Sequence, residues 1–374
     1  MKILQVNKYY SPDVGGVETV CQQYTELLGS EHDVTVLAIH KSFKLFTTVE
    51  NINGIKVIRC SSLGTYFSMP VSISFIFYFL WHLYRTNLAY FHLPCPLIDL
   101  AYALACFKRN VYVVWHSDIV KQKKLRKLLS PLLKYTLKRC RKILVTSPNL
   151  VKHSLFLQEY KSKCEIVPLS VNVKKIRETG GSEVVTNIFP DLTNIDALFF
   201  GRLCYYKGVE TLMEAIVSLE KSGEKVNIVI AGEGEYSEHI QRVIDDNQLA
   251  NVYFIRRYLT VEEKYSLLKS AKIFLFPSVE PSEAFGITQL EAMACGCPVI
   301  NTLLPSGVPW VSVNGMTGLS VKPYDVIALK EAILKLVDDK KLLNEYSKNA
   351  VKRVDSLFSD EVIHSQIKNL SIID

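Results

Sequence analysis

Residues 277–298 read P-S-V-E-P-S-E-A-F-G-I-T-Q-L-E-A-M-A-C-G-C-P, and this stretch decides the fold that we predict for the chain. The apolar run from Ile273 to Phe276 before it is typical of a buried parallel strand. Gly286 to Met293 has the pattern of a helix, which Gly296 and Pro298 end. The stretch therefore predicts a strand, a turn and a helix start, an arrangement at which α/β proteins bind ligands.

The start of this helix leaves backbone N–H groups without partners, because the first turn of any helix does. Phe285, Gly286 and Ile287 are therefore candidate main-chain donors to an anion or an oxygen-rich ligand. Glu283 would face that ligand, and Glu291 would reach a second part of it if the ligand is long. The simpler alternative is that both glutamates are ordinary helix residues, one favouring the helix dipole and the other solvated.

The glutamate pair and the small-residue sequence A-M-A-C-G-C-P-V-I around its end resemble the signature of the retaining glycosyltransferases of the GT-B fold, family four. The resemblance implies an α/β protein with two Rossmann-like parallel-sheet domains that face each other across a cleft. It implies an acceptor-binding domain over residues 1–175 and a nucleotide-sugar-binding domain over 190–355. A C-terminal helix, residues 356–374, is expected to pack back on the first domain.

The size and composition of the chain agree with a two-domain globular protein. At 374 residues the chain is longer than single hydrophobic cores usually support. The nine cysteines are scattered, with Cys295 and Cys297 alone close together, which favours a reducing compartment over a disulfide framework or a zinc site. Because Met1-Lys2 leads directly into a strand, we expect no targeting segment.

The net charge of +7 has a local origin, since residues 119–158 carry eleven Lys or Arg and no acid. Leucines recur there at helical spacing from Leu125 to Leu137, and Ser130-Pro131 predicts the start of a second helix. Two interpretations of these basic amphipathic helices stay open. Their leucines pack in the core beneath a solvated face, or residues 121–142 contact an anionic membrane surface or a lipid pyrophosphate. Without aromatic interleaving or a binding motif, nucleic acid is not an expected partner.

The segment from Val71 to Tyr84 is the one run that resembles a membrane span. It is bounded by Pro70 and Arg85 and is shorter than the roughly 20 apolar residues that a spanning helix needs. We therefore predict a buried or interface-lying helix.

The first half of the chain alternates apolar strands with helical patterns, which predicts a mostly parallel sheet covered by helices on both faces. Gly15-Gly16 follows the first strand without the G-x-G-x-x-G fingerprint of dinucleotide-binding proteins. The pair either shapes a tight turn or, as the resemblance implies, lets the backbone approach a donor diphosphate. His116 ends the predicted strand from Val111 and by residue type alone is a structural hydrogen-bonding residue. In similar enzymes a histidine after this strand contacts the transferred sugar.

The alternation stops between residues 167 and 187, where Gly180-Gly181 predicts a linker. A strand and helix pattern resumes at Asp196. Further on, Thr260 and Glu263 have the spacing of a capping box, so Glu263 is predicted to be structural.

A second motif, G-R-L-C-Y-Y-K-G at residues 201–208, leads into the first helix of the second domain. Arg202 could make paired hydrogen bonds to a departing diphosphate, and Lys207 could act on it as a point charge. Alternatively, both are surface residues of a helix-entry loop. Tyr258 is a further candidate for donor binding, although similar enzymes usually have glycine where Arg256 stands.

The resemblance, which rests on several motifs in the same order along the chain, implies a retaining, metal-independent hexosyltransferase with no cofactor. Arg202 and Lys207 would stabilise the leaving diphosphate, and Glu283 with the N–H groups of the helix start would orient the sugar hydroxyls. Glu291 would hold the ribose, and His116 would assist at the reacting sugar. The chain lacks a D-x-D-like arrangement of metal ligands, and the two cations make a divalent ion unnecessary.

The identity of the donor and acceptor follows from the resemblance alone. Y-Y-K-G and P-S-E-A-F-G look like bacterial mannosyltransferases of polysaccharide and O-antigen assembly, which implies GDP-mannose, while UDP-hexoses and dTDP-deoxysugars stay open. The expected acceptor is a glycan on a polyprenyl pyrophosphate, and the expected location is cytoplasmic, on the inner face of the membrane. Two rival functions are an NAD-dependent oxidoreductase, whose glycine fingerprint is missing, and a membrane-bound nucleotide-sugar-binding protein without activity.

Overall fold

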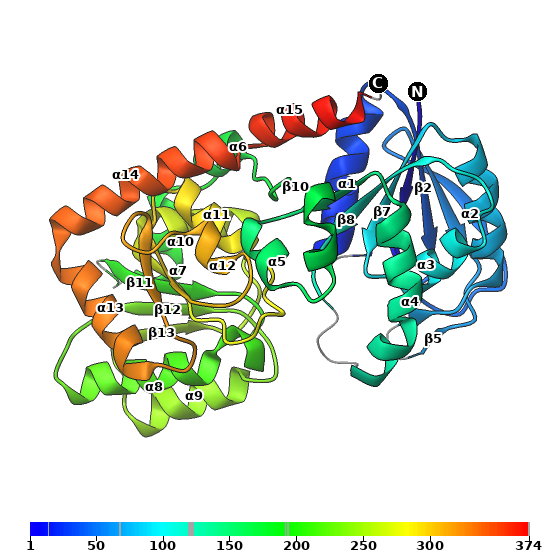
Figure 1. The fold of residues 1–374 in the computed structure, drawn as a ribbon. Helices are drawn as coiled ribbons and strands as arrows, with labels where there is room; N and C mark the ends of the chain where they lie inside the picture. Colours follow the sequence, from blue (N-terminus) through cyan, green and yellow to red (C-terminus); the bar gives the residue numbers. More distant parts are fainter. Residues whose placement is uncertain (14, 67–68, 119–122, 191, 193, 373–374) are drawn as a thin grey trace. The chain divides into compact units, whose positions relative to one another are not determined.

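The computed structural model describes residues 1–13, 15–66, 69–118, 123–190, 192 and 194–372, with the backbone alone described for 123–128. The chain forms two compact units, residues 1–167 with 364–374 and residues 168–363. Each unit is an α/β layer structure in which helices cover both faces of a sheet (Figure 1). The expected limits were 1–175, 190–355 and 356–374, whereas residues 168–175 and 356–363 belong to the second unit.

The first unit is built on a sheet that, within the described residues, has eight strands in the order β10-β9-β8-β7-β1-β2-β4-β3. All neighbouring strands are parallel except β3 and β4. The central strands are buried on both faces, which explains their continuous apolar sequences. The strands are β1 Lys2–Val6, β2 Asp33–Ile39, β3 Thr48–Ile52, β4 Ile55–Cys60, β7 Leu88–Leu93, β8 Asn110–Trp115, β9 Lys142–Val145 and β10 Cys164–Ile166, with a separate antiparallel pair, β5 Thr65–Tyr66 and β6 Met69–Pro70.

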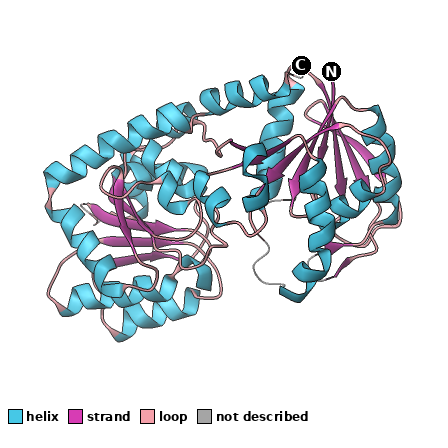
Figure 2. Cartoon of the chain, in the orientation of Figure 1, coloured by secondary structure: helices cyan, strands magenta, loops and turns pink. Residues whose placement is uncertain are grey.

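Helices cover the two faces of this sheet (Figure 2). The helices α2, α3 and α4 share one hydrophobic core with the sheet, while Tyr24 of α1 packs against Tyr90 on the other face. The last helix, α15, joins the first unit through hydrogen bonds from Tyr112 Oη to the Leu370 carbonyl and from Gln366 to the Ile166 carbonyl. The helices are α1 Gly16–Gly29, α2 Ile73–Arg85, α3 Pro96–Ala103, α4 Lys123–Arg139, α5 Pro148–His153, the 3₁₀ helix Leu157–Lys163 and α15 Asp360–Ser371.

The apolar run predicted as a buried or interface-lying helix is α2, and none of the helices that the structure describes is long and apolar enough to cross a membrane. The prediction that Ser130-Pro131 starts a second basic helix is wrong, because one helix, α4, runs through Pro131. A proline inside a helix removes one backbone hydrogen bond. Burial of Leu133 and Leu137 in the core offsets that loss.

The second unit has a six-stranded sheet within its described residues, parallel throughout, in the order β13-β12-β11-β14-β15-β16. One core cluster lies on each face, as the doubly wound arrangement requires. The strands are β11 Ile195–Phe200, β12 Ile228–Ala231, β13 Val252–Ile255, β14 Ala271–Phe276, β15 Val299–Thr302 and β16 Gly318–Val321. The helices are α6 Val173–Glu178, α7 Ser182–Ile188, the 3₁₀ helix Tyr205–Lys207, α8 Val209–Lys221, α9 Ser237–Asp246, α10 Val261–Ser270, α11 Ile287–Ala294, α12 Val308–Val311, α13 Val326–Asp338 and α14 Lys340–Leu357.

The segment predicted as a linker is structured, so that prediction is wrong. Residues 173–178 and 182–188 form α6 and α7, and Val173, Ile176 and Val185 lie in a core cluster of the second unit. Gly180 has a φ of +80° and lies against the carbonyl of Glu262, so it makes a turn between two packed helices.

Candidate active site

The loop between β11 and α8 lies directly against the loop that follows β14. Gly208 has a φ of +71°, and a Cβ built on it would lie 2.0 Å from the carbonyl oxygen of Pro277. The Val279 N–H donates to the carbonyl of Tyr206 at 2.8 Å. Because β11 and β14 are neighbours in the sheet, both loops leave the same edge at the carboxyl ends of their strands. Glycine at 208 therefore permits the close approach that brings Lys207 to the second loop.

Lys207 and Glu283 form an ion pair at this junction. The distance from Lys207 Nζ to Glu283 Oε2 is 2.5 Å, and the side chains are 13% and 12% exposed. Ser278 Oγ donates to the same carboxylate oxygen at 3.4 Å, and Nζ lies 4.9 Å from the centroid of the Phe276 ring. Burial, and then the nearby Glu283 carboxylate, raise the pKa of Tyr206 above its ordinary value. The junction thus holds an ammonium and a carboxylate, which suit an anion and a hydroxyl respectively.

Replacing Gly208 with alanine tests this close approach. We expect Gly208→Ala to lower the free energy of unfolding by about 1 kcal/mol for the left-handed backbone and about 1–3 kcal/mol more for the clash with Pro277. Gly223→Ala is the matched control, because Gly223 has a φ of +77° with open space around its Cβ position. Equal losses in the two variants, measured by chemical denaturation, would show that the loop contact is unimportant.

The start of α11 has free backbone donors two to four residues after Glu283 in the sequence. The predicted helix is confirmed within one residue at each end, and Gly286 is its N-cap with a φ of +80°. Among the described groups, the N–H groups of Phe285, Gly286 and Ile287 have no hydrogen-bond acceptor. The Phe285 ring is buried against Trp310, with 6.2 Å between ring centroids. This anchor holds the free N–H groups in one orientation.

Glu291 lies in the second turn of α11 and has a lysine partner of its own. Its Oε1 accepts from Lys264 Nζ at 2.5 Å and from Tyr265 Oη at 3.2 Å, and the residue is 8% exposed. Burial, and then Glu291, raise the pKa of Tyr265. The alternative that Glu291 is simply solvated is therefore wrong. Lys264 and Tyr265 were missed by sequence analysis because they belong to α10, and no local pattern links them to α11.

Arg202 is exposed at the start of the β11–α8 loop, and its guanidinium has no hydrogen bond or ion pair with the described residues. The adjoining β12–α9 loop packs tightly on this one. A Cβ on Gly232, at a φ of +146°, would lie 1.9 Å from the Gly201 carbonyl, and one on Gly234 would lie 2.2 Å from the Leu203 carbonyl. Glycine at 232 and 234 therefore lets the β12–α9 loop pack against the backbone on both sides of Arg202.

The loop after β13 carries the remaining candidate of the second unit. Tyr258 is 61% exposed, and the arginines before it are both engaged. Arg256 pairs with Glu238 at 2.5 Å, and Arg257 makes two hydrogen bonds to Glu263, at 2.7 and 2.8 Å. The capping box of Thr260 and Glu263 is confirmed.

The first unit contributes a pair of histidines at the carboxyl ends of β7 and β8. His92 Nδ1 lies 3.0 Å from His116 Nε2, and His92 Nε2 lies 3.0 Å from Gln5 Oε1. The amide oxygen can only accept, so His92 carries its proton on Nε2 and accepts from His116 at Nδ1. His116 then keeps Nδ1 as its acceptor. Sequence analysis gave His92 no role, because the contact depends on the neighbouring positions of β7 and β8 in the sheet.

Burial keeps both histidines neutral. It lowers the pKa of His116 to about 4 and, with a smaller effect of His116, lowers the pKa of His92 well below its ordinary value. In the unfolded chain His116 takes up a proton below pH 6.5, whereas in the folded protein it does so near pH 4. Stability is therefore lost as the pH falls from 6.5 towards 4 and is unaffected above 6.5.

A comparison of wild type with His116→Gln isolates this effect. We expect the free energy of unfolding of wild type to fall between pH 7.5 and pH 5 by about 2 kcal/mol more than that of the variant. Chemical denaturation at the two pH values measures the difference. Parallel losses would mean that His116 ionises normally in the folded protein.

Gly15 and Gly16 begin α1 after the first strand. Gly15 has an extended backbone, and a Cβ there would lie 2.2 Å from a Glu18 carboxylate oxygen. A Cβ on Gly16 would meet no described atom within 4 Å, and its φ is not positive. The Glu18 side chain can turn away from such a Cβ, so the described structure requires glycine at neither position.

Comparisons with known proteins identify the family. Residues 14–175 match the family model described as Glycosyltransferase Family 4, and residues 187–353 match the one described as Glycosyl transferases group 1. The O-antigen chain mannosyltransferase C of Escherichia coli is 30% identical over 98% of this chain and 97% of its own length. The chain belongs to the family-four GT-B glycosyltransferases.

A second relative agrees with this identification, and two solved structures share the fold. The D-rhamnosyltransferase WbpZ of Pseudomonas aeruginosa is 30% identical to this chain, over 96% of this chain and 92% of its own length. The fold matches that of HepE of Anabaena in complex with UDP, with a TM-score of 0.77 and 17% identity over 99% of both chains. Sucrose-phosphate synthase of Thermosynechococcus elongatus matches with a TM-score of 0.75 and 20% identity over 99% of this chain and 98% of its own. In the described part of the glycosyltransferase, His, Cys, Asp and Glu side chains form no group of three that could hold a metal.

Proposed function

We propose that this glycosyltransferase moves a hexose, with retention of anomeric configuration, from a nucleotide donor to a hydroxyl of a lipid-linked glycan in bacterial surface polysaccharide assembly. The observation that carries the proposal is the Lys207–Glu283 pair beside free backbone N–H groups. A nucleotide sugar has a diphosphate, which needs cations, and a sugar with several hydroxyls, which need carboxylate and N–H partners. The two kinds of partner meet at one edge of the second sheet.

Each residue has a proposed role in donor binding. Arg202 is exposed and makes no hydrogen bond with the described residues through its guanidinium, so it can pair with a diphosphate oxygen. Lys207 can exchange the Glu283 carboxylate for another diphosphate oxygen. These cations stabilise the charge that develops on the leaving diphosphate. Glu283 and the N–H groups of residues 285–287 orient the sugar hydroxyls, and Glu291, held by Lys264, binds the ribose.

Residues outside this set take supporting roles. Tyr258, exposed after β13, packs on the base, and the open space at Gly16 leaves room for the backbone of the Gly15-Gly16 turn to approach the diphosphate. The Nδ1 of neutral His116 accepts a hydrogen bond from a hydroxyl of the transferred sugar. No divalent ion is needed in this proposal, and transfer activity retained in EDTA tests that point.

The donor that we propose is GDP-mannose. The supporting observation is the 30% identity, over nearly the whole chain, to a relative described as an O-antigen chain mannosyltransferase. Another relative at the same identity is described as a D-rhamnosyltransferase, which makes an activated deoxyhexose an alternative donor. UDP-hexoses and dTDP-deoxysugars are the other donors to test.

A thermal-shift panel of GDP, UDP, dTDP, ADP and NAD tests the donor. We expect a selective shift with GDP, since a ligand at 100 times its Kd adds about 2.7 kcal/mol to the free energy of unfolding. A selective shift with UDP or dTDP would identify a UDP-sugar or dTDP-sugar as the donor in place of GDP-mannose. A shift with NAD alone would contradict the glycosyl-transfer mechanism. Binding without hydrolysis or transfer of GDP-mannose would identify a nucleotide-sugar-binding protein without activity.

The proposed acceptor, a glycan on a polyprenyl pyrophosphate, places the enzyme at the cytoplasmic face of the membrane. Sequence analysis offered residues 121–142 as the contact, but Lys121 lies outside the described residues, as do the side chains of Lys123, Lys124, Arg126 and Lys127. In the described half of α4, Leu133 and Leu137 are buried in the core. That half supports the interpretation of a solvated basic face over core leucines.

A further inference from the structure

Helix α2 is apolar on the side that faces solvent as well as on the side that packs. Phe75, Phe79 and Leu83 are fully buried in the core of the first unit. The opposite side presents Ile73, Phe77, Trp81 and Tyr84, which are 63%, 69%, 55% and 59% exposed and which we call the α2 stripe. Surface helices of globular proteins usually carry polar residues on that side. An outward stripe with three aromatic rings therefore indicates a surface that is covered during function.

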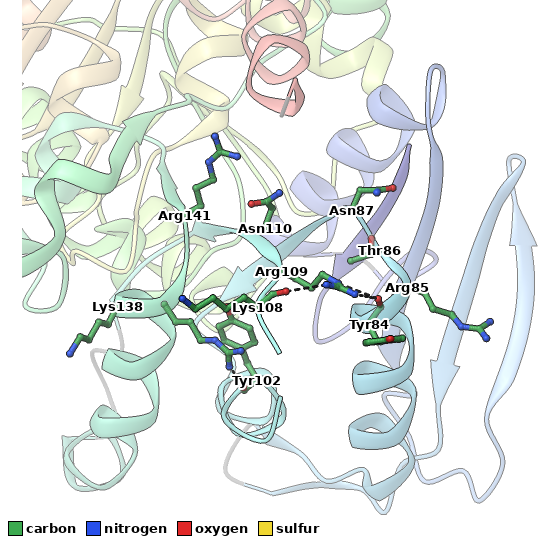
Figure 3. A pocket seen from close by; sticks show the side chains of 11 residues that line it. Tyr84, Arg85, Thr86, Asn87, Tyr102, Lys108, Arg109, Asn110, Lys138 and Arg141 are labelled. Carbon is green, nitrogen blue, oxygen red and sulfur yellow. Dashed lines mark hydrogen bonds between the residues drawn. The ribbon is translucent and has the colours of Figure 1, made fainter. Parts of the chain in front are cut away.

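A basic pocket lies at the end of this stripe. It has a volume of about 840 Å³, and its lining includes six cations and no carboxylate (Figure 3). The cations are Arg85, Lys108, Arg109, Lys138, Arg139 and Arg141. Tyr84 and Arg85 belong to α2, while Asn87, Asn110 and Arg141 stand at the amino ends of β7, β8 and β9. The pocket is thus at the opposite edge of the sheet from the histidine pair.

Two of the six cations have a structural role that accounts for them. Helix carboxyl ends attract cations, because their last carbonyls are unpaired. Arg109 donates to the Tyr84 carbonyl at 2.6 and 3.1 Å, a contact drawn in Figure 3, and Arg139 donates to the Tyr102 and Ala105 carbonyls at 3.1 and 2.7 Å. Both arginines therefore serve to cap α2 and α3.

The other four cations are not explained in this way. The side chains of Lys108, Lys138 and Arg141 make no hydrogen bond or ion pair with the described residues, and Arg85 lies over the Trp81 ring at 3.8 Å. Arg85 thereby joins the pocket to the α2 stripe. Cations that lack carboxylate partners are available to anions from outside the protein.

We propose that the α2 stripe and the basic pocket form one binding surface for a membrane of anionic phospholipids. Trp and Tyr side chains favour the interface between lipid and water, and Lys and Arg bind the phosphate groups at the same depth. A second copy of this chain is a poor occupant, because a symmetric contact would bring two basic pockets together. The inference rests on the proposed function only in that a lipid-linked acceptor calls for a membrane-bound enzyme.

Co-sedimentation with vesicles tests the surface in the full-length protein. We expect binding to vesicles of phosphatidylglycerol and phosphatidylcholine, weak binding to phosphatidylcholine alone, and a loss of binding at high salt. Each cation at a membrane surface contributes about fivefold to the partition constant, so Lys108→Gln with Arg141→Gln weakens binding about 25-fold. Phe77→Ser with Trp81→Ser removes the inserted side chains and weakens it at least about tenfold.

Matched controls change the same kinds of side chain on the second unit. Ile327 is 70% exposed, and Lys341 and Lys352 are exposed. Ile327→Ser, and Lys341→Gln with Lys352→Gln, are expected to bind vesicles like wild type. Thermal unfolding and donor hydrolysis, both measured without vesicles, confirm that every variant is folded. Donor hydrolysis needs no membrane, so its absence in wild type would contradict the proposed function. Vesicle binding would still test the binding surface, because it does not depend on that activity.

Four outcomes would overturn the inference. The first is that wild type does not bind anionic vesicles. The second is that the stripe and pocket variants bind as wild type does. Alternatively, neutralising Lys121, Lys123, Lys124, Arg126 and Lys127 abolishes binding while the stripe variant keeps it, which would move the contact to α4. Finally, wild type elutes as a dimer that Phe77→Ser with Trp81→Ser dissociates, without vesicle binding, which would make the stripe a self-association surface. Quenching of Trp81 fluorescence by brominated lipid, lost in Trp81→Phe, gives an independent positive result.

Discussion

Lys207→Ala is expected to lower kcat for sugar transfer by about 10²–10³-fold, the usual cost of removing one group that stabilises developing negative charge. In the structure the Lys207 ammonium lies 2.5 Å from the Glu283 carboxylate, which keeps it at the proposed site until a diphosphate oxygen replaces that partner. Steady-state kinetics at saturating donor measure the loss. An unchanged kcat would remove Lys207 from the mechanism.

Lys264→Ala is the matched control for this variant, because Lys264 makes an ion pair of the same length with Glu291 in the same unit. We expect it to raise KM for the donor and to leave kcat within a few-fold of wild type. A second control separates catalysis from stability. Lys207→Ala leaves the mostly buried Glu283 carboxylate without its cation. Adding Glu283→Gln is expected to restore the melting temperature but not kcat.

Glu283→Ala is expected to lower kcat by about 10- to 10²-fold, since a hydrogen bond to a charged group contributes about 1.5–3 kcal/mol. Glu291→Ala is expected to raise KM for the donor about tenfold with little change in kcat, because ribose contacts are the same in ground and transition states. The same kinetic assay measures both. If the two variants lost kcat equally, the division of roles between the glutamates would be wrong.

Much of the fold could be predicted because strands buried on both faces are continuous apolar runs. The strand before residue 277 and the helix after Gly286 were both predicted within two residues of their observed ends. The elements that were missed lack that signal. Strand β3 lies at the sheet edge with alternating exposure. The helices α6 and α7 are short and are separated by Gly180 and Gly181, so their sequence resembled a linker.

The candidate site could be predicted where its residues belong to one local motif and not where they meet across elements. The residues of the helix start at 285–287 follow from sequence alone. The contact of His92 with His116 depends on strand order, and that of Lys264 with Glu291 depends on how α10 packs on α11. Pairings of this kind are properties of the tertiary structure, and neither sequence spacing nor residue type reports them.

Helix α15 has a consequence for biosynthesis, because residues 364–374 complete a unit that begins at the amino terminus. The ribosome must add the roughly 200 residues of the second unit before the first is whole, which takes about 10–40 s at ordinary elongation rates. During that time Tyr112 Oη has no Leu370 carbonyl to bind, and the face of the sheet beneath α15 is uncovered. Nascent chains of this enzyme therefore carry an unfinished first unit while the second is made, a period in which chaperones have a site to bind.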